Sequence, residues 1–120
     1  MTRVLVIDDD SMQLELVSRS LSLEGFEVET AEGPSGLAAI VERFNPNVVL
    51  LDVNVPGSTS GDMVAKVREV AGAKTSIVLF SSWEDSKLRR LTLETKANGW
   101  LSKSCTGLEL ARRLKEMVGP

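Results

Sequence analysis

Residues 48–56, VVLLDVNVP, predict the strand around which the chain is organised. The stretch starts with four apolar residues, two of them β-branched, a run typical of a strand buried on both faces of a parallel sheet. The run ends at one carboxylate, Asp52, and Pro56 follows in a turn. Ligands bind outside the carboxyl ends of strands in open α/β sheets, so Asp52 stands where chemistry would be done. Taken alone, Asp52 would more often serve only to open the turn.

Strand and helix patterns alternate five times along the chain, which predicts one α/β domain with parallel strands and helices on both faces of the sheet. The expected strands are residues 3–8, 26–31, 48–52, 77–80 and 99–102. The expected helices are residues 11–24, 33–44, about 62–70, 83–96 and about 107–118. Apolar and acidic residues alternate over residues 26–31, which predicts a half-exposed edge strand.

Composition excludes several classes of function. The 120 residues include no histidine, which rules out Ser-His-Asp and Cys-His catalysis and His-ligated zinc. The one cysteine, Cys105, fits a reducing cytosol, and no apolar run reaches the roughly 20 residues of a membrane helix, so we predict a cytoplasmic domain without membrane contact. The first half of the chain is acidic, and the basic residues of the second half are dispersed along helices, so we predict no direct binding of nucleic acid.

Polar groups end four of the five predicted strands, and these groups are Asp8 and Asp9, Asp52, Ser81, and Lys103. The carboxyl ends of parallel strands share one edge, so we expect these side chains to converge. Three carboxylates placed close together repel one another unless a cation is present, and Mg²⁺ prefers such oxygen ligands. With such an ion bound, an aspartate can attack a phosphoryl group, while a lysine and a hydroxyl hold the transferred oxygens.

The acids after the first strand have a competing structural role, because an acid often caps the helix that follows. One cap needs one acid, and Asp10 is the best placed to cap the helix expected from residue 11. With Gln13 three residues on, Asp10 would form a capping box. Capping is therefore a poor account of Asp8 and Asp9.

These motifs together resemble the receiver domains of bacterial two-component response regulators. VLVIDDD is similar to the first strand of that family with its acidic pair, and LLDVNVP to the strand that carries the phosphoacceptor. IVLFSS is similar to the strand that ends in a hydroxyl, and NGWLSK to the strand with an aromatic residue and a lysine. The resemblance covers residues 1–120. It implies a flavodoxin-like (βα)5 fold, a doubly wound parallel sheet with strand order 2-1-3-4-5.

The resemblance also implies roles for individual residues. Asp52 would be the phosphoacceptor. The implied Mg²⁺ ligands are Asp8, Asp9, Asp52 and the backbone carbonyl of Asn54, and the residues implied to contact the phosphoryl group are Ser81 and Lys103. The chain would act as no enzyme beyond catalysing its own phosphorylation and dephosphorylation.

A phosphorylation switch and two kinds of partner follow from the same resemblance. A sensor histidine kinase or a phosphotransfer protein would phosphorylate Asp52, Ser81 would then move toward the phosphoryl oxygens, and Trp100 would turn inward. A downstream output domain or protein would recognise the altered face of the fourth helix, fifth strand and fifth helix, and the domain is a candidate for homodimerisation on activation. Residues expected on that face are Arg89, Arg90, Trp100, Leu108, Arg112 and Arg113, and residues expected to face the kinase are Met12, Gln13, Leu16 and Arg19.

The chain departs from the pattern of the family at three places. Ser104 follows Lys103 where the family usually has a proline with a cis bond, which predicts a different local backbone and a displaced lysine. The loop over residues 56–61 is one residue longer than usual. Trp83 is bulky at a position that varies widely in the family, and we hypothesise that it shields the phosphoryl group on Asp52 from water.

Two other classes of function remain to be weighed. VLVIDDDS also fits the start of haloacid-dehalogenase-type phosphatases, with Asp8 as nucleophile and Asp10 as acid, but those enzymes normally have a longer chain and would leave LLDVNVP unexplained. A receiver-like interaction module that is never phosphorylated is the other alternative. Ser104 and the longer loop are consistent with it, whereas the presence of all four charged residues argues against it: Asp8, Asp9, Asp52 and Lys103. A dinucleotide-binding domain is disfavoured because no glycine-rich fingerprint follows the first strand.

Overall fold

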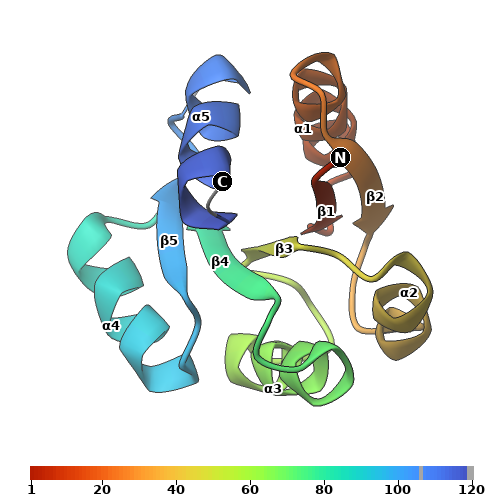
Figure 1. Ribbon diagram of the computed structural model, residues 1–120. Helices are drawn as coiled ribbons and strands as arrows, with labels where there is room; N and C mark the ends of the chain where they lie inside the picture. Colours follow the sequence, from red (N-terminus) through yellow and green to blue (C-terminus); the bar gives the residue numbers. More distant parts are fainter. Residues whose placement is uncertain (106, 119–120) are drawn as a thin grey trace.

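The computed structural model describes residues 1–105 and 107–118. Within these residues, five strands form one parallel sheet in the order β2-β1-β3-β4-β5, which confirms the predicted fold (Figure 1). The strands are β1 (Arg3–Ile7), β2 (Glu27–Ala31), β3 (Val48–Asp52), β4 (Ser76–Ser81) and β5 (Gly99–Ser102). The helices are α1 (Ser11–Leu23), α2 (Leu37–Phe44), α3 (Ser60–Ala71), α4 (Asp85–Thr95) and α5 (Gly107–Val118).

Helices cover both faces of the sheet. In Figure 1, α1 and α5 lie on one face, α2 and α3 lie on the other, and α4 packs beside β5. Every residue of β3 is buried, and its apolar side chains alternate between the two cores. Val48 and Leu50 join the core beneath α1 and α5, whereas Val49 and Leu51 join the core beneath α2 and α3. The unbroken apolar run in the sequence is therefore the signature of a central strand.

Helix α1 begins where its cap was predicted, but the capping box is only half formed. The side chain of Asp10 accepts hydrogen bonds from the N–H groups of Met12 and Gln13, at 3.0 and 3.3 Å. The N–H of Asp10 donates to Asp8 Oδ1 at 3.0 Å, where the box predicted the side chain of Gln13 as acceptor. The buried carboxylate of Asp8 has taken that donor, so the prediction for Gln13 was wrong.

Three other helices begin at residues that differ from the predicted ones. Helix α2 begins at Leu37 because Gly36 adopts a left-handed conformation with φ of 70°. Helix α3 begins at Ser60 because the hydroxyl of Thr59 accepts the N–H of Asp62 at 3.0 Å. Helix α4 begins at Asp85, two residues later than predicted. No helix among the described residues combines the length and apolar character needed to cross a bilayer.

Candidate functional site

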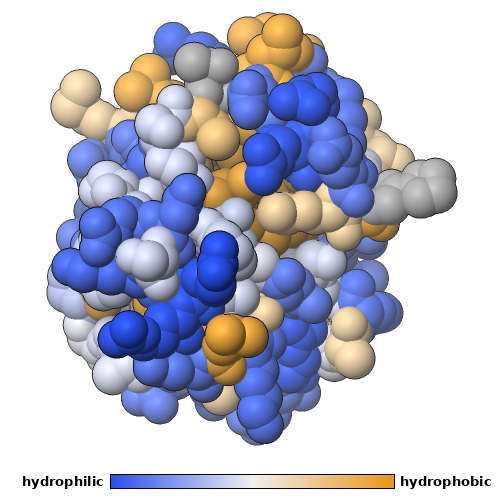
Figure 2. Space-filling model, turned by 90° about the vertical axis from the view of Figure 1, so that its left-hand side faces the viewer, coloured by the Kyte–Doolittle hydropathy of each residue, from blue (hydrophilic) through white to orange (hydrophobic). Residues whose placement is uncertain are grey.

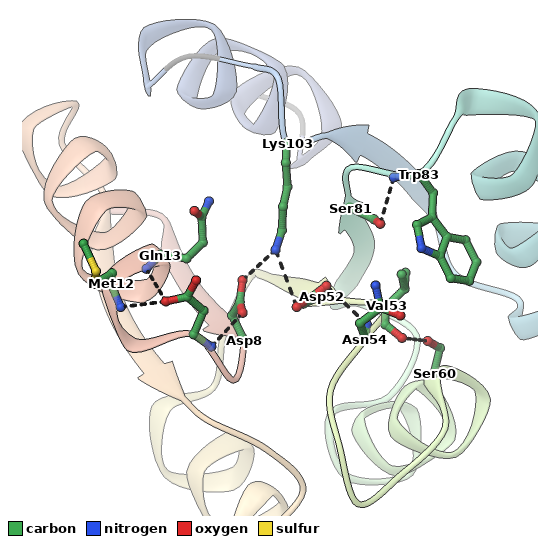
Figure 3. Close-up of polar contacts among 11 residues, drawn as sticks. Asp8, Met12, Gln13, Asp52, Val53, Asn54, Ser60, Ser81, Trp83 and Lys103 are labelled. Atoms are coloured by element: carbon green, nitrogen blue, oxygen red, sulfur yellow. Dashed lines mark hydrogen bonds and ion pairs between the residues drawn. The ribbon is translucent and has the colours of Figure 1, made fainter.

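The carboxyl edge of the sheet brings the predicted polar residues together (Figure 3). Asp8 and Asp9 follow β1, and Asp52 is the last residue of β3. Each of these three aspartates offers a carboxylate oxygen, and the three oxygens lie within 4.8 Å of one another. Asp8 and Asp52 are only 1% and 6% exposed, whereas Asp9 is exposed. The site therefore consists of two buried acidic side chains and one exposed acidic side chain, and it is open to solvent on the side of Asp9.

Backbone hydrogen bonds fix the orientation of both buried carboxylates. Oδ1 of Asp8 accepts the N–H of Asp10, and Oδ1 of Asp52 accepts the N–H of Asn54 at 3.2 Å. The hydroxyl of Ser60 donates to the carbonyl of Val53 at 3.2 Å, which ties the start of α3 to the loop after β3. Each carboxylate is therefore bound to the backbone through one oxygen, and its other oxygen, Oδ2, faces Lys103.

Lys103 supplies the positive charge at this edge. Its Nζ donates a hydrogen bond to Asp8 Oδ2 at 2.9 Å and lies 3.5 Å from Asp52 Oδ2 (Figure 3). Its main-chain N–H donates to the carbonyl of Ser81 at 2.9 Å, so its backbone is held by β4. The ring of Phe80, which the sequence analysis did not single out, has its centroid 5.7 Å from Nζ.

Ser104 does not displace Lys103, contrary to the expectation from its replacement of proline. The N–H of Ser104 donates to the hydroxyl of Ser102 at 3.1 Å, and the two hydroxyls are 2.8 Å apart. The N–H of Cys105 donates to the carbonyl of Ser102 at 3.1 Å. No peptide bond among the described residues is cis. The turn after β5 is thus closed by serine hydrogen bonds, one of which needs an N–H that proline lacks.

The electrostatics of the site couple Asp52 to its neighbours. Burial raises the pKa of Asp52 above its ordinary value of 3.8, and the charge of Asp8 adds to this rise, while the N–H of Asn54 and the charge of Lys103 oppose it. For Lys103, burial lowers the pKa, but the hydrogen bond to Asp8 and the charges of Asp52 and Asp8 outweigh burial, so the pKa of the ammonium is raised. The ammonium of Lys103 therefore lies between the side chains of two buried aspartates, Asp8 and Asp52.

The donor set of the site fits a hard divalent cation. Three carboxylates with facing oxygens and a single compensating ammonium leave an excess of negative charge, and Mg²⁺ is bound in proteins by such oxygens. The residues that could hold it are Asp8, Asp9 and Asp52, with the carbonyl of Asn54 as the additional ligand that the resemblance implies.

Ser81 and Trp83 form the side of the site next to β4. Ser81 is buried, and its hydroxyl accepts the N–H of Trp83 at 3.1 Å. This bond holds the loop before α4 in a turn, which explains why α4 begins after Trp83. Trp83 is 38% exposed, and Figure 3 shows its indole leaving the chain next to Ser81.

Figure 2 views the molecule from the side on which α4, β5 and α5 lie in Figure 1, and the residues predicted to signal belong to these three elements. Trp100 is half-buried on β5, and it lines a cavity of about 360 Å³ with Asp85 from α4 and Arg113 and Met117 from α5. Figure 2 shows apolar atoms in a hollow of this face, surrounded by hydrophilic residues. The other residues predicted for this face are all exposed: Arg89, Arg90, Leu108, Arg112 and Arg113.

Helix α1 presents the residues predicted to face a kinase. Met12 and Leu16 are 73% and 57% exposed, so both apolar side chains lie on the surface of the helix. Gln13 and Leu16 line a second cavity, of about 130 Å³, between α1 and α5. Arg19 is exposed and pairs with Glu15 at 2.9 Å.

Comparison with known proteins gives a consistent result. The family model described as "Response regulator receiver domain" matches residues 4–115. A transcriptional regulatory protein of Haemophilus influenzae, the CpxR homolog, is 36% identical over 120 residues, which are 98% of this chain and 51% of that protein. PrrA of Mycobacterium tuberculosis, also a transcriptional regulatory protein, is 36% identical over 119 residues, which are 97% of this chain and 49% of that protein.

The chain thus spans about half the length of these curated relatives. Among solved structures, the chemotaxis response regulator CheY4 of Vibrio cholerae superposes with a TM-score of 0.86 at 29% identity, covering 98% of both chains.

Proposed function

Because the chain belongs to the family of response regulator receiver domains, which act in two-component signalling, we propose that it is switched by phosphorylation of Asp52. The observation that carries this proposal is the position of Asp52 at the end of β3, with Lys103 at 3.5 Å and the carboxylates of Asp8 and Asp9 beside it. A nucleophilic carboxylate next to a cation-binding acidic pair and a fixed ammonium is the arrangement that phosphoryl transfer requires.

In the proposed reaction, a carboxylate oxygen of Asp52 forms a bond to phosphorus. The bond from phosphorus to the donor breaks, and its electron pair leaves with the donor, which is the imidazole nitrogen of a phosphohistidine or the acetate of acetyl phosphate. Mg²⁺ held by Asp8, Asp9, Asp52 and the carbonyl of Asn54 would neutralise charge on the transferring oxygens. Lys103 and the hydroxyl of Ser81 donate to the same oxygens, and hydrolysis of the acyl phosphate returns Asp52 to its starting form.

The structure of the loop after β4 supports a role for Ser81 in the switch. Its hydroxyl accepts the N–H of Trp83 and therefore still has its own proton to donate. A phosphoryl oxygen on Asp52 would attract that proton and draw Ser81 and the following loop toward the site. We propose that Trp100 then turns inward and changes the face of α4, β5 and α5.

The partners and the setting are proposed on the same basis. Residues 1–120 would form one receiver domain that receives its phosphoryl group from a sensor histidine kinase or a phosphotransfer protein and passes the signal to an output domain or protein. We propose a cytoplasmic location and no catalysis other than its own phosphorylation and dephosphorylation. We also propose that phosphorylation favours a homodimer.

Two observations favour this proposal over the alternatives. The carboxylate of Asp10 is engaged by two N–H groups at the start of α1, so it is poorly placed to act as the acid of a phosphatase. Lys103 keeps its contacts with Asp8 and Asp52 despite Ser104, which removes a reason to expect an unphosphorylated module.

The test is phosphorylation by acetyl phosphate with Mg²⁺, followed by intact mass and tryptophan fluorescence. We expect the wild type to gain one phosphoryl group and change its fluorescence, and beryllofluoride with Mg²⁺ to reproduce that change. Asp52→Asn should show neither effect, while Asp62→Asn, which alters an exposed acid on α3, should behave as the wild type. A wild type without an adduct, or an adduct that persists in Asp52→Asn, would contradict the proposal.

A further inference from the structure

Three side chains surround the ammonium group of Lys103. Two are the carboxylates of Asp8 and Asp52, at 2.9 and 3.5 Å from Nζ. The third is the ring of Phe80, whose centroid lies 5.7 Å from Nζ, within the distance of about 6 Å at which a cation is attracted to an aromatic face. Phe80 is thus the one uncharged group of the three.

The register of the sheet explains why Phe80 lies there. Phe80 pairs with Asp52 across β3 and β4 and with Leu101 across β4 and β5. Phe80 and Leu101 belong to the same core, beneath α1 and α5. Side chains alternate along a strand, so Lys103, two residues beyond Leu101, leaves the chain on the same side as the ring. The carbonyl of Ser81 accepts the main-chain N–H of Lys103, and the ring of Phe80 contacts its ammonium. Two consecutive residues of β4 therefore contact Lys103, one at the main chain and one at the end of the side chain.

The attraction of Nζ to the ring of Phe80 differs from its attraction to the two carboxylates, because a ligand bound at the site weakens only the second. A divalent cation would compete directly for the carboxylate oxygens that now hold Nζ, and a phosphoryl group would be bonded to one oxygen of Asp52, whereas neither would change the ring of Phe80. We therefore propose that Phe80 is a positioning residue, which keeps Lys103 directed at Asp52 when the carboxylates are engaged elsewhere. The functional part of this inference rests on the proposed phosphorylation of Asp52.

The surroundings of Phe80 make the inference testable by substitution. Phe80 is 2% exposed and lines the cavity of about 130 Å³ between α1 and α5. Phe80→Leu removes the ring while keeping an apolar side chain, and Phe80→Tyr keeps the ring. The chain also contains a matched control, because Phe26 is 4% exposed and its ring lies 5.6 Å from Nζ of Lys115, an exposed lysine on α5.

The first measurement is NMR of the chain labelled with ¹³C at lysine. The ring current of Phe80 should shift the Cε protons of Lys103, so Phe80→Leu should return their signal toward the value of a free lysine. Phe26→Leu should leave Lys103 unchanged and move the signal of Lys115. If Phe80→Leu leaves the Lys103 signal in place, Phe80 does not position this lysine and the inference fails. This measurement needs no phosphorylation.

The second measurement is the rate of phosphorylation by acetyl phosphate with Mg²⁺. Phe80→Leu should lower the rate about twofold to tenfold, the range expected for one cation–π contact, while Phe80→Tyr and Phe26→Leu should retain the wild-type rate. In a Lys103→Ala background, Phe80→Leu should cause no further loss. An equal loss in both backgrounds would show that the ring acts through packing alone and would overturn the inference. A wild type that forms no adduct overturns the proposed function, whereas the NMR comparison still decides whether the ring of Phe80 contacts Lys103.

Discussion

The ammonium of Lys103 donates to Asp8 Oδ2 at 2.9 Å, so a hydrogen bond joins two residues that are 95 positions apart in the chain. Asp8 follows β1 and Lys103 follows β5, and the bond therefore closes the carboxyl edge of the sheet across β3 and β4. The bond links stability to function, because the charge that holds the edge together is also the charge proposed to receive the phosphoryl oxygens.

Removal of Lys103 should destabilise the domain when no cation is present. Lys103→Met leaves Asp8 and Asp52 facing each other without an ammonium, and we expect it to lower the free energy of unfolding by about 1–3 kcal/mol at pH 7. Urea denaturation in EDTA measures this loss, and added Mg²⁺ should reduce it because the cation replaces the missing charge. Lys66→Met, at an exposed position on α3, is the control and should change little. Equal losses with and without Mg²⁺ would count against the electrostatic explanation.

Substitution of Asp52 should raise the free energy of unfolding, whereas substitution of Lys103 lowers it. Its pKa is raised above 3.8 in the folded state, chiefly by burial, so its ionisation disfavours folding. Protonated Asp52 favours the folded state. Its contribution to the free energy of unfolding is therefore fully present below pH 3.8 and is lost as the pH rises through the raised pKa. Asp52→Asn should therefore be more stable than the wild type at pH 7 in EDTA, and its advantage should shrink as the pH falls and vanish below 3.8. Urea denaturation across this range tests the prediction, which is wrong if the variant is the less stable protein at pH 7.

The sequence was sufficient for the sheet and for the convergence of its polar ends. Residue patterns with periods near 2 and 3.6 separate strands from helices, and parallel strands bring residues such as Asp52 and Lys103 to one edge whatever their distance in the chain. What the sequence left open depends on side chains that meet only in the fold. Phe80 contacts Lys103 because two strand registers place it there, and Arg68 reaches the side chain of Asn98, 30 residues away, at 2.7 Å.

The helix starts show the same limit on a smaller scale. The cap at Asp10 was predictable because this acid directly precedes the apolar pattern of the helix, and the cap is present. Two details were not predictable: that Asp8 accepts the N–H of Asp10, and that Thr59 caps α3 two residues before the predicted start. In each case the sequence offers more than one side chain that could accept the free N–H group.

Mg²⁺ should stabilise the folded chain, and the effect should separate Asp9 from Asp10. At a Mg²⁺ concentration ten times its Kd, we expect a gain of about 1.4 kcal/mol in the free energy of unfolding of the wild type. Asp9→Asn removes one proposed ligand and should lose most of this gain. Asp10→Asn should keep it, because asparagine caps α1 as well as aspartate does. Thermal unfolding with Mg²⁺ and with EDTA measures both variants, and an equal response of the two would argue against Asp9 as a ligand.

Trp83 should prolong the life of the phosphoryl group on Asp52. Trp83 is an exposed residue at 38%, its main-chain N–H donates to the hydroxyl of Ser81, and Figure 3 shows its indole beside the site. Trp83→Ala should open the site to water and raise the rate of autodephosphorylation severalfold, measured as loss of the adduct after the donor is removed. Leu93→Ala, at a residue of α4 that is 74% exposed, should leave the rate unchanged. The same rate in Trp83→Ala and the wild type would end the shielding hypothesis.

Gly107 should be required for the close packing of α5 on α1. A Cβ at this position would lie 2.8 Å from both Cβ and Oγ of Ser20, and the first of these atoms cannot move without the helix backbone. Gly107→Ala should therefore cost about 1–3 kcal/mol in the free energy of unfolding. Steric conflict predicts that the cost falls in a Ser20→Gly background, where both atoms are absent, although that background is itself less stable because glycine weakens a helix.

Gly61 is the matched control, because a Cβ there meets nothing closer than 3.9 Å. Gly61→Ala lies in the first turn of α3 and should be neutral or stabilising by up to about 1 kcal/mol. Urea denaturation of the four variants decides the matter. If Gly107→Ala costs the same with Ser20 and with glycine at position 20, the loss does not come from contact with α1, and another reason for glycine at the start of α5 must be sought.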